Sequence, residues 1–64
     1  MTQKELLYVK DAIMHEKNTI GILNETLDLL EDSDLVNFVE KEVKIHSTIF
    51  SKLSKLLEDK ANEW

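Results

Sequence analysis

Two apolar stripes, each interrupted once by an ionisable side chain, constrain this chain more than any other feature. Positions spaced alternately by three and four residues are large and aliphatic at seven of eight places in the first half, the exception being Glu16. The second half repeats this spacing, and its ionisable member is His46. The stripe positions are Leu6, Val9, Ile13, Glu16, Ile20, Leu23, Leu27 and Leu30, then Val36, Val39, Val43, His46, Phe50, Leu53 and Leu57. This period is typical of α-helices and not of β-strands.

The two stripes are out of phase, so the chain must turn between them. A single continuous helix would carry the first stripe onto polar residues only: Asp34, Asn37, Lys41, Lys44, Thr48, Ser51, Lys55 and Glu58. We therefore predict one all-α domain over residues 1–64. Its first helix runs from about 3–30, its turn covers about 31–34, and its second helix runs from about 34–61.

The ends of the expected helices carry capping signals. Thr2 and Glu5 have the spacing of a capping box, in which each side chain bonds the backbone N–H of the other residue. Asp32 or Ser33 can N-cap the second helix. Trp64 is expected either to fray or to cover the end of the core.

Two helices of this length joined by a short turn form an antiparallel hairpin. Each apolar face is wider than a two-helix contact needs. The flanking residues are Tyr8, Ala12 and Ile22 in the first half and Leu35, Phe38, Ile45, Ile49 and Leu56 in the second. A hairpin this small also buries little surface. We therefore predict a homodimer that forms a four-helix bundle.

Gly21, inside the first helix, is either a tolerated surface residue or a point where another helix approaches closely.

Composition excludes several classes of function. The net charge of −5 and the absence of arginine disfavour nucleic-acid and anionic-membrane partners. The chain has no cysteine for disulfide or thiolate chemistry. We identify no nucleophile–base arrangement and no phosphate-binding loop, so we predict that the protein is not an enzyme. With no signal-peptide pattern and no apolar membrane span, we expect a soluble, cytoplasmic protein.

The interruptions of the stripes suggest a polar layer. Folding the hairpin at residues 32–33 brings Glu16 and His46 to nearly the same height, and Glu42 lies one turn from His46. Three hypotheses follow. Glu16 and His46 form a buried pair that fixes register; or Glu16, Glu42 and His46 bind a divalent metal such as iron or manganese; or Glu16 tilts to the rim. The usual bundle motif is Glu-x-x-His, whereas the spacing here is Glu42-x-x-x-His46.

Three segments resemble the spore coat protein F-like family, small ferritin-like helical proteins of spore-forming Firmicutes. They are Met1 to Tyr8, His15-Glu16-Lys17, and the stretch from Asp34-Leu35 to Phe50. The resemblance implies a helical hairpin or four-helix bundle, a role in or around the spore coat, and no established enzymatic activity. Family members often carry a Glu-His step in the second helix; the matching step here is Glu42-Val43, and His46 lies one turn on.

These observations predict a non-enzymatic structural or assembly protein that acts as a homodimer without a cofactor, with the spore coat or other helical proteins as candidate partners. The first alternative is a ferritin-like metal-binding bundle that uses the Glu/His layer. The second is a small regulator that binds another helical protein through its hairpin.

Overall fold

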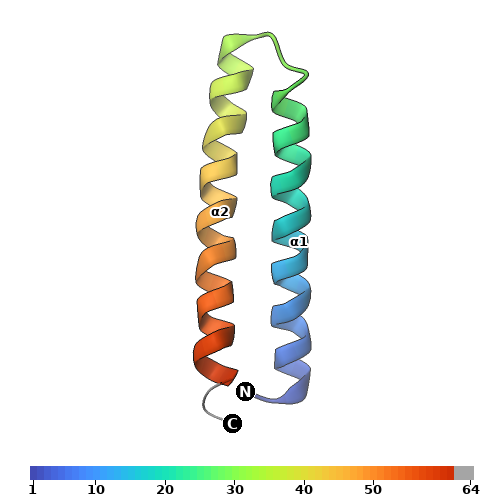
Figure 1. Cartoon of the computed structure of the whole chain (residues 1–64), viewed down its shortest axis with the longest axis vertical. Coiled ribbons are helices and arrows are strands. Elements are labelled where there is room, and N and C mark those ends of the chain that lie inside the picture. Colours follow the sequence, from blue (N-terminus) through green and yellow to red (C-terminus); the bar gives the residue numbers. More distant parts are fainter. Residues whose placement is uncertain (62–64) are drawn as a thin grey trace.

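The protein is a single antiparallel helical hairpin, seen here in a computed structural model that describes residues 1–61 (Figure 1). Helix α1 spans Gln3–Leu27 and helix α2 spans Ser33–Ala61, and the two pack along their whole length. The described chain measures 48 × 15 × 12 Å. The predicted all-α hairpin is confirmed. Trp64, expected at the end of the core, lies outside the described residues.

Side chains that precede each helix satisfy its first backbone N–H groups. The Thr2 N–H donates to Glu5 Oε1 at 2.8 Å, and the Glu5 N–H donates to Thr2 Oγ1 at 3.1 Å, so the predicted capping box is present. At α2, Asp32 Oδ1 accepts from the N–H groups of Asp34 at 2.9 Å and Leu35 at 3.0 Å. Of the two residues proposed as the second cap, Asp32 is therefore the one that acts.

Helix α1 ends at Leu27, three residues before the expected end at Leu30. Asp28 caps it, and the N–H of Leu29 donates to the carbonyl of Thr26 at 3.0 Å, a tighter i→i+3 bond that ends the α-helical pattern. Leu30 continues the apolar stripe and is half-buried, although its backbone is no longer helical. The turn consequently covers residues 28–32 and not the predicted 31–34, because the backbone leaves the helix before the apolar stripe ends.

The seam between the helices is formed by the two stripes, but it does not close into a core. The stripe runs the length of both helices, and all of its members, Leu57 included, are half-buried. Among residues 1–60, no side chain is fully buried. Neither described helix has a segment apolar enough to cross a membrane. One face of each helix therefore packs on the other, while much apolar surface stays open to solvent.

Candidate functional site

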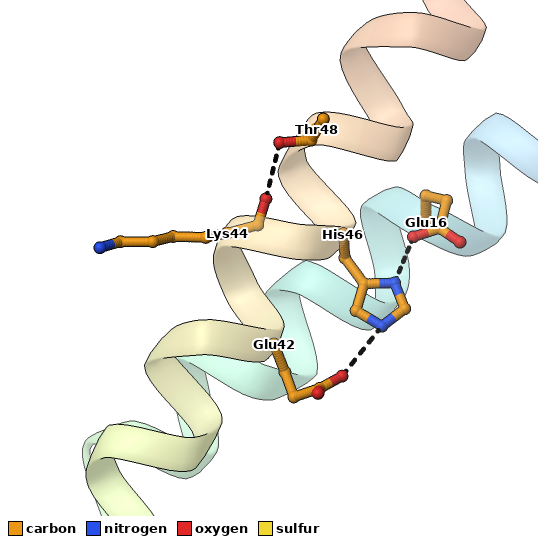
Figure 2. Close-up of polar contacts among 5 residues, drawn as sticks. All are labelled: Glu16, Glu42, Lys44, His46 and Thr48. Carbon is orange, nitrogen blue, oxygen red and sulfur yellow. Dashed lines mark hydrogen bonds and ion pairs between the residues drawn. The ribbon is translucent and has the colours of Figure 1, made fainter.

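A polar contact joins the two helices near the middle of the hairpin. His46 Nδ1 lies 2.5 Å from Glu16 Oε2, and His46 Nε2 lies 3.7 Å from Glu42 Oε2 (Figure 2). Because an ionised carboxylate only accepts hydrogen bonds, Nδ1 of the imidazole donates to Glu16. The second distance is too long for a hydrogen bond and corresponds to an ion pair when the ring is protonated. One imidazole thus lies between two carboxylates.

Helical periodicity places these three residues on the inner side of the hairpin. Glu42 and His46 are one turn apart on α2, and Glu16 reaches them from α1. Lys44 extends in another direction in Figure 2, and the Thr48 hydroxyl donates to its backbone carbonyl at 3.0 Å. Lys44, which lies between Glu42 and His46 along the chain, therefore does not enter the polar contact.

The geometry excludes one of the three hypotheses for the polar layer. Glu16 contacts His46, so the hypothesis that Glu16 tilts away to the rim is wrong. The register hypothesis expected a buried pair, whereas the side chains of His46 and Glu16 remain 26% and 21% exposed in the single chain. The pair is formed, but solvent still reaches it.

The metal hypothesis for Glu16, Glu42 and His46 stays a prediction. Within the part of the chain that the structure describes, no group of three or more His, Asp or Glu residues is arranged to hold a metal ion. The two carboxylates approach opposite nitrogens of the ring, so the three groups do not converge on one point. A site built from them needs a change of rotamer or ligands from another chain.

A second candidate site is an apolar surface along the hairpin. Ten large apolar residues are exposed among the described residues. Eight of them form what we call the apolar face: Tyr8, Ile22, Leu29, Leu35, Phe38, Ile45, Ile49 and Leu56. The other two, Leu7 and Met14, lie elsewhere on α1.

These eight residues share one side because of how the helices are related. Seven of them lie within α1 and α2, where they follow the same flank of the stripe, and Leu29 follows in the turn after α1. Two antiparallel helices are related by a two-fold axis perpendicular to the plane that contains them. This rotation exchanges the helices but keeps each side of the plane in place, so the same flank of both helices lies on the same side. The opposite flank of α1 carries Lys10, Lys17 and Asn24, which are exposed and polar. The hairpin is therefore apolar on one broad side and polar on the other.

The sequence already indicated that both stripes were widened, but not that the added residues lie on a common side. Leu29 was not foreseen, because it was placed inside a helix and is in fact 82% exposed in the turn. Its apolar character beside the polar turn residues is the signal that could have identified it.

Comparison with known proteins does not identify a relative of this chain: no family model, no curated protein and no solved structure matches it.

Proposed function

We propose that this protein is a small, non-enzymatic structural or assembly protein that acts as a homodimeric four-helix bundle, with the apolar faces of two hairpins packed together. The observation that carries the proposal is the gathering of eight large exposed apolar side chains on one side of a hairpin in which residues 1–60 include no buried side chain. Exposed apolar surface on this scale is typical of protein–protein contacts.

The magnitudes favour association. Fully burying a large apolar side chain contributes about 1.5–3 kcal/mol. The eight residues of the apolar face are between 37% and 82% exposed, so about half of that gain is still available at each of them. Burying the apolar faces of both copies would contribute about 16 kcal/mol in total. The estimated cost of association is about 4–15 kcal/mol, so the gain is large enough to offset it.

The biological setting of the bundle follows from the sequence resemblance alone. Similarity to spore coat protein F-like proteins supports a role in coat assembly, with other coat proteins as partners. The alternative, a metal-binding bundle, is supported by the two carboxylates beside the His46 imidazole. In a dimer, Glu16, Glu42 and His46 of both copies would be available as ligands, whereas a single chain offers only one set.

Sedimentation equilibrium at micromolar concentration tests the proposal. Ile45 lies on the apolar face and is 51% exposed, whereas Met14 lies on the polar side of α1 and is 61% exposed. Ile45→Glu should convert the dimer to a monomer, because it places a carboxylate in the contact. Met14→Glu, the matched control, should leave the dimer intact. A compact, well-folded parent monomer would contradict the proposal, as would equal behaviour of the two variants. A dimer so weak that another helical protein displaces it would favour the regulator alternative.

A further inference from the structure

The hairpin is strongly asymmetric in charge along its length. Residues 18–40, which form the half that contains the turn, have no lysine and six carboxylates: Glu25, Asp28, Glu31, Asp32, Asp34 and Glu40. All eight lysines lie in residues 1–17 and 41–61, together with six carboxylates. The turn half therefore carries a net charge of −6, and the open half carries +2 over the described residues.

The carboxylates of the turn half are in contact with solvent. Each of the six carboxylate residues of the turn half is exposed. The hairpin is 48 Å long, which is several times the Debye length of about 8 Å at physiological ionic strength. The two ends therefore act on a docked partner as separate fields of different sign.

We infer that a second copy of this chain docks on the apolar face with its turn at the opposite end, so that each acidic turn half lies beside the lysine-bearing half of the other hairpin. The inference rests on the proposed dimer and specifies its orientation. Two closed two-fold arrangements bring the apolar faces together. A two-fold axis parallel to the helices puts both turns at one end, and an axis across the helices puts them at opposite ends.

Apolar burial does not choose between these arrangements, because both cover the same eight residues. Charge does choose. With the turns together, a net charge of −6 faces another of −6; with the turns apart, each −6 faces +2. The arrangement with turns apart also separates the two acidic turns by roughly the length of the molecule, far beyond the screening distance.

The opposed arrangement gives the polar contact a defined place. An axis across the helices passes through the middle of the bundle, which is the height of the Glu16–His46 contact. The two copies of that contact then face each other at the centre, on either side of the axis. On α1, the height of Lys4 in one copy falls near that of Asp28 in the other.

Distances between spin labels test the orientation. The chain has no cysteine, so single-cysteine variants carry one label per chain. Glu31→Cys places the label in the turn, and Thr48→Cys places it at mid-height on α2. We expect a label-to-label distance near the 48 Å length of the hairpin at position 31 and a much shorter one at position 48. A short distance at position 31 would overturn the orientation while leaving the dimer established by position 48. Absence of any inter-label distance at position 48 would overturn the dimer itself.

A charge reversal tests the cause. In the Glu31→Cys background, adding Glu25→Lys and Asp28→Lys removes most of the negative charge of the turn half, and lysine is favourable at the C-terminus of a helix. We expect a short-distance population to appear. The matched control reverses Asp11 and Glu58 in the open half to lysine and should retain only the long distance. Persistence of the long distance alone in the turn-half variant would refute charge as the determinant of orientation.

Discussion

Glu16 Oε2 and His46 Nδ1 meet at 2.5 Å although the two residues are 30 positions apart in the sequence. This contact is a hydrogen bond between a side chain of α1 and a side chain of α2. It lies where both apolar stripes are interrupted, so a shift of one helix by one turn would set each ionisable group against aliphatic neighbours. We therefore propose that the contact favours one register of the hairpin over its neighbours.

Replacing the two partners should have opposite effects. Glu16→Leu completes the first stripe, and exchange of an ionic group for an apolar one is often neutral or stabilising by up to a few kcal/mol. We expect that gain together with mixed oligomers, because register is less specified. His46→Leu leaves Glu16 without its donor and should destabilise the protein, by less than the about 1–3 kcal/mol of a fully buried group, because solvent reaches Glu16. Thermal melts and sedimentation of the parent and both variants measure these effects.

The same melts repeated with a chelator separate the structural role from the metal hypothesis. A structural contact predicts a parent whose melting temperature does not respond to chelation. A metal site predicts a parent that chelation destabilises, and two variants that are equally weakened and insensitive. We expect the first result. The second would replace the register role with metal binding by Glu16, Glu42 and His46.

Asp32 should be the most important residue of the turn. Its carboxylate accepts from two backbone N–H groups at the start of α2, at 2.9 and 3.0 Å. Asp32→Ala should cost about 1 kcal/mol and lower the melting temperature by about 4–8 °C for a domain of this size. Glu31→Ala is the matched control, since no cap is assigned to Glu31, and it should change stability little. Equal effects of the two substitutions would argue against the cap.

Thr2 controls the ionisation of Glu5. Hydrogen bonds from the Thr2 backbone N–H, and then from its side chain, hold the pKa of Glu5 below its ordinary value. A carboxyl group whose pKa is lowered by folding stabilises the protein fully when the pH is above its ordinary pKa. This stabilisation is lost as the pH falls through the lowered pKa. Thr2→Ala keeps the backbone N–H and removes only the side-chain hydrogen bond, so it should raise the pKa of Glu5 part of the way to its ordinary value. The difference in stability between parent and variant should narrow in acid. Carboxyl titration by NMR, with Lys4→Ala as control, measures the shift; an unchanged Glu5 pKa in Thr2→Ala would contradict it.

Gly21 offers a test of how α1 is covered. A Cβ built there meets no atom within 4 Å in the single chain, so α2 does not approach it. Gly21→Ala should therefore stabilise the helix by about 1 kcal/mol, through the helix propensity of alanine. Denaturant melts at several protein concentrations measure this. Destabilisation that grows with protein concentration would place another helix against Gly21, as the alternative interpretation of this glycine requires.

The fold was largely predictable because its determinants are periodic or local. The stripe phases specify two helices and a turn, and the caps at Thr2 and Asp32 depend on neighbours only two or three residues away. The end of α1 was predicted three residues too late, because the stripe continues to Leu30 after the backbone has left the helix. No glycine or proline marks that end.

The candidate sites were predictable only in part. Spacing brought Glu16 and His46 to the same height, but the separation of His46 from Glu42 depends on side-chain rotamers that spacing does not determine. Likewise, the flanking apolar residues were visible in the sequence, whereas their common side depends on the way two antiparallel helices present the same flank. The uneven distribution of charge along the sequence becomes a difference between the two ends of the molecule only after the chain folds, because the turn brings residues 18–40 together at one end.

The lack of a fully buried side chain among residues 1–60 has a consequence for abundance in the cell. In the proposed bundle, the hairpin completes its core only on meeting a second copy, so folding becomes a bimolecular event. The midpoint of unfolding then rises with protein concentration. At low concentration, newly made chains would remain loosely folded and open to proteases. The protein would accumulate only when its concentration is high enough for dimers to form. The steady-state level of such a protein would therefore rise more steeply than its rate of synthesis.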